Sequence, residues 1–199
     1  MELARLDKRL LDCLKKHGGV LMVEDVEELD YCRAILPVYA HAGLLERYGK
    51  DVYICPGVPV DNMFYLRRRV PAAIFSHESA LYLHGLIRRR PTSYVVTIPS
   101  ATKLPRGLAV ECTGYYAVPA LYELGVTEAK TSQGHTVRVY DVERSICDLL
   151  RRRRMPDTAC KLSTIMKRYF AGSEKNHERL IAYGERLGVM KKLLPYLKS

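Results

Sequence analysis

The first 57 residues contain three short helical patterns, and their spacing constrains the fold more than any other feature of the sequence. Apolar side chains recur there at intervals of three and four, which places them on one face of a helix. These patterns cover residues 3–14, 23–29 and 35–42. Gly18-Gly19 and Gly43 follow the first and the third, where glycine commonly ends a helix. We therefore expect three short helices before residue 43.

Two short apolar runs follow at residues 44–48 and 52–55, separated by Gly49-Lys50-Asp51. This pattern is typical of two strands joined by a tight hairpin. Three helices followed by a hairpin is the order of a winged helix-turn-helix, in which the third helix enters the DNA major groove and the wing contacts the backbone or minor groove. On this layout the side chains predicted to contact DNA are Arg33, Val38, His41, Arg47 and Lys50.

Two features of this segment weaken the prediction of DNA binding. Residues 1–57 hold eight Lys/Arg against ten Asp/Glu, a net charge of −2, and the second helical pattern has a strongly acidic outer face. Pro37 lies inside the third pattern, where proline removes a backbone donor and kinks the helix or delays its start. A winged helix can also serve purely in protein interaction, so that role stays open.

Pro56-Gly57-Val58-Pro59 marks the expected boundary between a domain of residues 1–57 and a domain of residues 58–199. In the second domain Ser76 and Asp141 are candidate helix N-caps. Strands are predicted at 94–98, 108–112 and 137–140, and helices at 77–85, 141–150, 158–170 and 174–196 with a break at Gly188. The expected class is α+β, a winged helix-turn-helix followed by a mixed α/β domain with a terminal helical segment.

The positive charge of the chain lies in the second domain, which holds 24 Lys/Arg against 12 Asp/Glu. Three arginine runs supply ten of these charges: Arg67, Arg68 and Arg69; Arg88, Arg89 and Arg90; Arg151, Arg152, Arg153 and Arg154. We predict that they form a basic face that contacts the phosphates of DNA or an acidic RNA or protein partner. For each run the alternative is solvated surface without a binding role.

The sequence favours a cytoplasmic protein without a membrane partner. Charges interrupt the first 16 residues, so they lack the apolar stretch of a signal peptide or a membrane span. No pair of cysteines has C-x-x-C spacing, so free thiols are expected and a disulfide or zinc framework is the alternative. The cysteines are Cys13, Cys32, Cys55, Cys112, Cys147 and Cys160.

Two patterns resemble metal sites. His77 and His84 lie seven residues apart beside Glu78, but the H-E-x-x-H spacing of zinc enzymes is absent. We therefore expect no metal there, and expect His77 and Glu78 to start a helix or to form hydrogen bonds. The second pattern is E-x-K, used by magnesium-dependent nucleases, and it comprises Glu128 and Lys130 with Glu111 as the upstream acid. A plain surface role is favoured for it, because such tripeptides arise often by chance. We therefore expect no catalytic residues and no cofactor, with a metal-dependent nuclease as the alternative.

Several segments together resemble the AbiEi family, antitoxins and transcriptional regulators of abortive-infection type IV toxin–antitoxin systems. The resemblance covers nearly the whole chain. It rests on Gly18-Gly19-Val20, Gly43-Leu44-Leu45-Glu46-Arg47, Val52-Tyr53, Ser76-His77-Glu78-Ser79-Ala80, Leu83-His84-Gly85-Leu86, Val96-Thr97-Ile98-Pro99 and the segment 140–149 (YDVERSICDL).

The resemblance implies a winged-helix domain that represses its own operon at inverted repeats of operator DNA. It also implies that residues 58–199 oppose a nucleotidyltransferase-like toxin encoded beside it. Operator contact maps onto the outward face of the third helix and the wing, the same five residues that the helix–hairpin layout indicates. Family members tend to carry more Lys and Arg on that helix, and Pro37 is a further departure.

Overall fold

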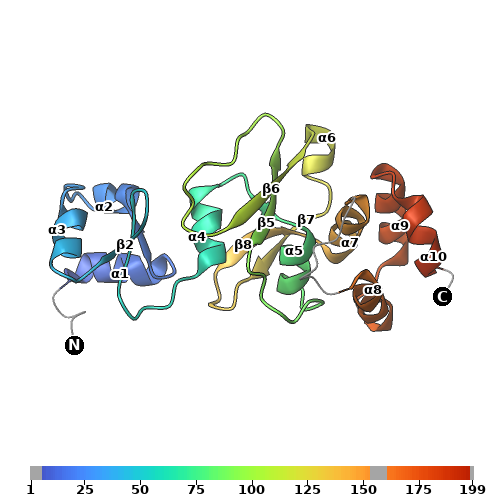
Figure 1. Cartoon of the computed structure of the whole chain (residues 1–199), viewed down its shortest axis with the longest axis horizontal. Helices are drawn as coiled ribbons and strands as arrows, with labels where there is room; N and C mark the ends of the chain where they lie inside the picture. Colours follow the sequence, from blue (N-terminus) through green and yellow to red (C-terminus); the bar gives the residue numbers. More distant parts are fainter. Residues whose placement is uncertain (1–5, 153–160, 198–199) are drawn as a thin grey trace. The chain divides into compact units, whose positions relative to one another are not determined.

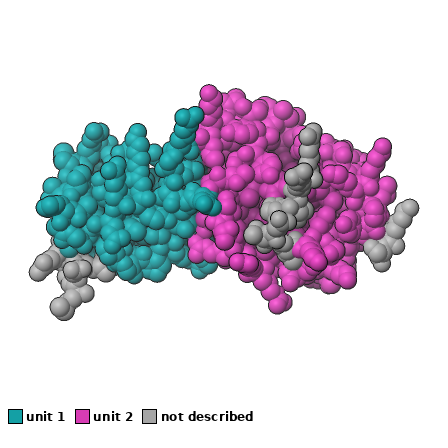
Figure 2. Space-filling view, viewed as in Figure 1, with its two compact units in different colours: residues 1–71, 105–111, 131–136 teal, residues 72–104, 112–130, 137–199 magenta. Residues whose placement is uncertain are grey.

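The computed structural model describes residues 6–152 and 161–197, which divide into two compact units (Figures 1 and 2). Each unit contains helices and a β-sheet, so the predicted α+β class is confirmed. Unit 1 comprises residues 1–71, 105–111 and 131–136, and unit 2 comprises residues 72–104, 112–130 and 137–199. No helix of the described ranges is long and apolar enough to cross a membrane.

The three helices predicted in the first segment are present in unit 1. They are α1 (Lys8–Lys16), α2 (Val23–Glu28) and α3 (Ile35–His41). Helix α1 begins where the Asp7 carboxylate accepts the Arg9 backbone N–H at 2.8 Å, and it ends before Gly18 and Gly19, which both have positive φ. The apolar faces of these helices meet in one core that includes the fully buried Leu10, Leu14 and Leu36.

Helix α3 begins at Ile35, which explains how it tolerates a proline. Pro37 lies in the first turn, where backbone nitrogens have no acceptor within the helix, so its missing N–H costs no hydrogen bond. One expectation is corrected here, because Arg33 lies in the turn before α3 and not on the helix.

The sheet of unit 1 contains the predicted hairpin and a third strand. Strands β2 (Glu46–Gly49) and β3 (Val52–Ile54) pair antiparallel, with Arg47 opposite Tyr53 and positive φ at Asp51 in the turn. The sequence interpretation missed β1 (Val20–Met22), which pairs antiparallel with β3 and gives the order β1-β3-β2. All three residues of β1 are buried, so the strand lacks the alternation that would identify it.

Helix α4 (Asn62–Arg69) was also missed, and it belongs to unit 1 rather than to the expected second domain of residues 58–199. Asp61 caps it by accepting the Phe64 backbone N–H at 3.1 Å. The same carboxylate accepts a hydrogen bond from the Thr131 hydroxyl and lies 2.8 Å from Nδ1 of His135. Unit 1 therefore extends past the expected boundary at residue 57.

A five-stranded mixed sheet forms the centre of unit 2, in the order β6-β5-β4-β8-β7. Strand β5 runs antiparallel to β4 and parallel to β6, and β4 runs parallel to β8. The strands are β4 (Ile74–Phe75), β5 (Tyr94–Pro99), β6 (Cys112–Ala117), β7 (Val126–Lys130) and β8 (Thr136–Tyr140). The strand expected at 108–112 is wrong: pairing with β5 starts at Cys112, and the Ala109 N–H donates to the Tyr65 hydroxyl within unit 1.

The helices of unit 2 pack around α7 (Val142–Arg151), which contacts α5 (His77–Leu83) and α9 (His177–Arg186). Asp141 caps α7 as predicted, accepting the Arg144 N–H at 2.8 Å. Ser76 does not cap α5 with its side chain, because that hydroxyl instead accepts from Thr97 at 2.9 Å. The remaining helices are α6 (Pro119–Tyr122), α8 (Leu162–Ala171) and α10 (Met190–Leu197).

The terminal helical segment has the predicted break. Gly188 has a φ of 68° and separates α9 from α10. Apolar side chains of α7, α8, α9 and α10 share one core, in which Ile146, Ile165 and Leu180 are fully buried. These helices are coloured from orange to red in Figure 1.

Candidate functional sites

All five residues predicted to contact DNA lie at the surface of unit 1. Val38 is 63% exposed on α3, and His41 at the end of that helix is exposed as well. Arg33 is exposed in the preceding turn, Arg47 on β2, and Lys50 in the hairpin turn. The hairpin carries Arg47 and Lys50 together with Glu46 and Asp51, so its net charge is zero, and α3 contains no Lys or Arg.

The first arginine run is engaged inside unit 1. Arg68 of α4 forms an ion pair with Asp25 of α2, which is 2% exposed. Beside it, Nη1 of Arg69 lies 3.8 Å from a carboxylate oxygen of Glu24, and Arg67 donates to the Pro71 carbonyl at 3.1 Å. Helix α4 therefore neutralises part of the acidic face that the sequence predicted for α2.

Asp25 also belongs to a cluster with the elements of a metal site. The Cys13 sulfur lies 3.4 Å from Nδ1 of His17, and that nitrogen lies 3.0 Å from Asp25. Burial lowers the pKa of His17 and raises the pKa of the Cys13 thiol. Because the guanidinium of Arg68 contacts the same Asp25 oxygen, positive charge already occupies this place, and the cluster is better described as a hydrogen-bond network.

The second arginine run is exposed, whereas the members of the third run differ in the exposure of their side chains. Arg88 and Arg89 are exposed, whereas Arg90 donates to the Tyr94 hydroxyl at 2.7 Å. The side chain of Arg151 is 47% exposed and that of Arg152 only 7%. The remaining members, Arg153 and Arg154, lie outside the described residues.

Arg144 is the most buried cation of unit 2, at 1% exposure, and its contacts fix it in place. Its Nε donates to Asp148 at 3.0 Å, and its Nη1 donates to the carbonyls of Leu121 and Leu124 at 2.7 and 3.0 Å. The guanidinium carbon lies 4.3 Å from the centre of the Tyr140 ring. These contacts join α7 to the segment around α6.

A second buried pair joins Arg152, at the end of α7, to Glu78 in the first turn of α5. The Arg152 guanidinium also lies 5.0 Å from the centre of the Tyr115 ring. Within the described part of the chain, Nε of Arg152 and Oε2 of Glu78 are buried and have no hydrogen-bond partner. A buried polar atom without a partner costs free energy, so this pair is only half satisfied.

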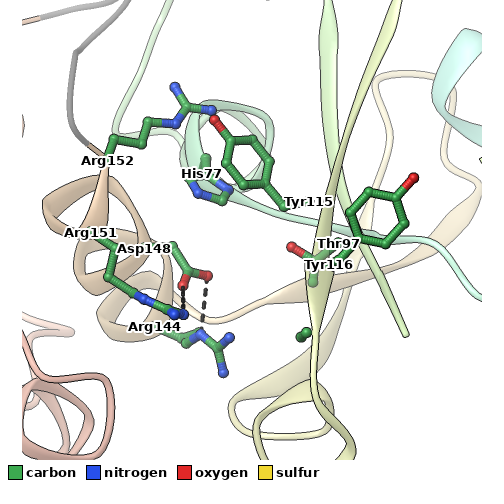
Figure 3. Close-up of a pocket in the computed structure, with 9 residues that line it drawn as sticks. His77, Thr97, Tyr115, Tyr116, Arg144, Asp148, Arg151 and Arg152 are labelled. Atoms are coloured by element: carbon green, nitrogen blue, oxygen red, sulfur yellow. Dashed lines mark hydrogen bonds and ion pairs between the residues drawn. The ribbon is translucent and has the colours of Figure 1, made fainter. Parts of the chain in front are cut away.

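The Arg144–Asp148 pair and Arg152 of the Arg152–Glu78 pair line a pocket of about 210 Å³ in unit 2 (Figure 3). Its lining comes from α5, β5, β6 and α7: His77, Thr97, Tyr115, Tyr116, Ala117, Arg144, Asp148, Arg151 and Arg152. In Figure 3 the rings of His77 and Tyr115 lie beside each other next to Arg152, with their centres 4.1 Å apart, and Arg151 lies beside Asp148. The lining therefore contains three guanidinium groups and one carboxylate, and two of the guanidinium groups, those of Arg144 and Arg151, lie beside that carboxylate.

His77 is a neutral member of this wall. Burial lowers its pKa well below 6.5, and the neighbouring Arg152, Arg144 and Arg151 act in the same direction. Its φ is 53°, an uncommon backbone conformation for a residue other than glycine. The ring can therefore accept or donate a hydrogen bond at neutral pH without adding charge.

The hydrogen-bonding roles predicted for His77 and Glu78 are confirmed, and His84 forms a hydrogen bond as well. Nδ1 of His77 lies 3.0 Å from the Ser76 hydroxyl, Nε2 of His84 lies 2.9 Å from the Tyr140 carbonyl oxygen, and Glu78 pairs with Arg152. The three side chains thus bind three different partners and do not converge on one point.

The E-x-K pattern lies at the surface. Glu128 and Lys130 are exposed on β7, and Glu111 is exposed outside the strands. Neither carboxylate belongs to a group of three close metal-ligating side chains within the described residues. The nuclease alternative therefore gains no support from side-chain grouping.

The cysteines of the described residues form no disulfide with one another; they are Cys13, Cys32, Cys55, Cys112 and Cys147. Burial raises the pKa of Cys112 to about 11 and the pKa of Cys147 to about 12. Both thiols are therefore protonated at neutral pH and poorly reactive. Cys160 lies outside the described residues.

Comparison with known proteins bears on the fold. No protein-family model and no curated protein sequence matches the chain. The fold is similar to that in the crystal structure of the RV2827C protein from Mycobacterium tuberculosis, with a TM-score of 0.61 over 89% of this chain and 70% of that chain. The two sequences are 16% identical over this region, so the likeness shows a shared fold and nothing about activity.

Proposed function

We propose that this protein is a DNA-binding antitoxin and autoregulatory repressor of the AbiEi type, with a winged helix-turn-helix in unit 1. The observation that carries the proposal is the order of α1, α2, α3 and the β2–β3 hairpin, which leaves α3 and the hairpin turn exposed. The resemblance of the sequence to AbiEi antitoxins supplies the second half of the proposal, action against a nucleotidyltransferase-like toxin.

The charge of unit 1 removes one objection to DNA binding. Counted over the whole compact unit, Lys/Arg and Asp/Glu are equal at twelve each, because residues 58–71 and 105–111 contribute four arginines and two acids. Asp25 and Glu24 are the acidic residues that pair with arginines of α4. The negative charge of residues 1–57 alone therefore overstates the repulsion that DNA would meet.

Retardation of the gene's own promoter in a gel tests the DNA half. The double variant Arg47→Ala with Lys50→Ala should lose specific retardation, and the slope of log affinity against log salt should fall by about 2 if both residues contact phosphates. The matched control removes the same charge from exposed positions of α1, as Lys15→Ala with Lys16→Ala, and should retain specific binding. Equal binding by wild type and the hairpin variant would refute the assigned contact surface.

The antitoxin half is tested by rescue of cells that express the neighbouring toxin gene. The full chain is used, because unit 1 includes segments far beyond residue 57 and a truncation at that point would expose its core. We expect the Arg47→Ala, Lys50→Ala variant to rescue growth as well as wild type, since toxin opposition is assigned to the second part of the chain. Loss of rescue by a folded variant would contradict this division of roles.

A further inference from the structure

We propose that the pocket of unit 2 is a binding site for a phosphate group, either inorganic phosphate or the phosphate monoester of a nucleotide. The site is built by α5, β5, β6 and α7 of one unit (Figure 3). It contains none of the five residues of the α3 and hairpin surface, so the proposal does not depend on the operator contacts proposed above. Arg151 and Arg152 belong to the third arginine run, and the proposal gives these two residues a small phosphate ligand in place of DNA.

The charge of the pocket selects an anion. Arg144, Arg151 and Arg152 line it against the single carboxylate of Asp148. Even with Glu78 added behind Arg152, three guanidinium groups oppose two carboxylates. Arginine presents a planar set of N–H donors that suits the oxygens of phosphate, and its attraction is stronger where water is excluded.

An unsatisfied donor at the pocket points to a missing acceptor. Nη1 of Arg152 is held by Glu78, while Nε of the same group is buried without a partner among the described residues. The Arg152 side chain is 7% exposed and lies over the Tyr115 ring, so it cannot turn freely into solvent. Arg152 lines the pocket, so a phosphate oxygen bound there would supply an acceptor for this incompletely satisfied guanidinium group.

The uncharged part of the pocket lining and the pocket volume are also compatible with a phosphate group. His77 is neutral and stacked on Tyr115, so it supplies a hydrogen-bonding edge without requiring a counter-ion. A volume of about 210 Å³ is enough for a phosphate group. The positive lining also disfavours a bound metal cation, because its charge would add to that of the three arginines.

Binding is measured by calorimetry on the full chain, with inorganic phosphate, AMP and adenosine as probes. Phosphate and AMP should bind and adenosine should not. The variant Arg151→Gln should weaken affinity by about 10-fold, because one charge-assisted contact is lost. The variant Asp148→Asn should strengthen it, since the only carboxylate of the lining loses its charge. Arg151 is 47% exposed, so its replacement is not expected to unfold the chain.

The matched control is Arg88→Gln, which removes the same charge from an exposed position outside the lining and should leave affinity unchanged. Tighter binding of AMP than of phosphate identifies a nucleotide as the source, and equal binding identifies free phosphate. Absence of binding for both, equal binding of adenosine, or the same loss in Arg88→Gln and Arg151→Gln would overturn the proposal.

Discussion

The two units each bury an aspartate against an arginine, and the surroundings of the two carboxylates differ. In unit 1, Asp25 accepts the Met22 backbone N–H at 2.8 Å and contacts His17 and Arg68, which ties α1, α2 and α4 together. In unit 2, Asp148 shares Arg144 with backbone carbonyls and lines a pocket. The Asp25–Arg68 pair therefore lies between packed helices of unit 1, whereas the Asp148–Arg144 pair of unit 2 lines a pocket.

The largest loss of stability should come from breaking the Asp25–Arg68 ion pair of unit 1. Replacing Asp25 by Asn removes the charge that Arg68 and His17 face, and the buried guanidinium is left uncompensated. We expect the free energy of unfolding to fall by about 3–5 kcal/mol. Urea unfolding of the full chain measures it. The control Glu24→Gln alters a carboxylate that is 62% exposed and 3.8 Å from Arg69, and should have almost no effect.

The pair that faces the pocket should be less sensitive. After Asp148→Asn, Arg144 keeps the carbonyls of Leu121 and Leu124, and water can enter the neighbouring pocket. We expect a loss of about 1–3 kcal/mol in the same urea experiment. A loss as large as that of Asp25→Asn would mean that the Asp148–Arg144 pair stabilises its unit as much as the Asp25–Arg68 pair does, and that the contrast between the two units is wrong.

Local signals were sufficient to predict much of the fold. The three helices of the first segment follow from apolar periodicity and glycine, the hairpin from Gly49-Lys50-Asp51, and the start of α7 from Asp141. Strand β1 and helix α4 were missed for physical reasons. Strand β1 has no alternation because both its faces are buried, and the arginines of α4 look like solvated surface until their partners are known.

The pocket of unit 2 and the ion pairs of the arginine runs could not be predicted from the sequence. The arginine runs were noticed as charge, but the burial of Arg68 and Arg152 depends on carboxylates 43 and 74 positions away in the sequence. Neither distance follows from a local pattern. The capping position and first turn of α5 were noticed as well, yet their relation to Arg152 and Tyr115 required the tertiary fold.

The two units should also differ in their response to acid. Burial lowers the pKa of His77 well below 6.5 and also lowers that of His17. The unfolded chain therefore takes up protons near pH 6.5 that the folded chain binds only at lower pH, so stability is lost as pH falls from 7 to 5.5. A single histidine contributes at most about 1.4 kcal/mol per pH unit.

Comparison of single variants separates the two contributions. His77→Asn should reduce the pH dependence of unfolding more than His17→Asn does, because Asp25 partly offsets the effect of burial on His17. Asparagine is chosen at position 77 because it tolerates positive φ. Urea unfolding at pH 7.0, 6.0 and 5.5 gives the slopes, and equal slopes in wild type and His77→Asn would contradict the buried, neutral state of this ring.

The smallest effects are expected from single hydroxyl groups. In unit 2 the Tyr183 hydroxyl donates to Asp141 at 3.0 Å, and in unit 1 the Tyr48 hydroxyl donates to Asn62 at 2.8 Å. Replacement by Phe keeps each ring and removes one hydrogen bond. Tyr183→Phe should cost about 1–2 kcal/mol, because its acceptor is a partly buried carboxylate, and Tyr48→Phe about 0.5–1 kcal/mol, because its acceptor is a neutral amide. Asp141 retains the Arg144 N–H in either case, so α7 stays capped and helix content by circular dichroism should not change. A larger loss for Tyr48→Phe than for Tyr183→Phe would show that packing around the rings, and not the charge of the acceptor, decides these stabilities.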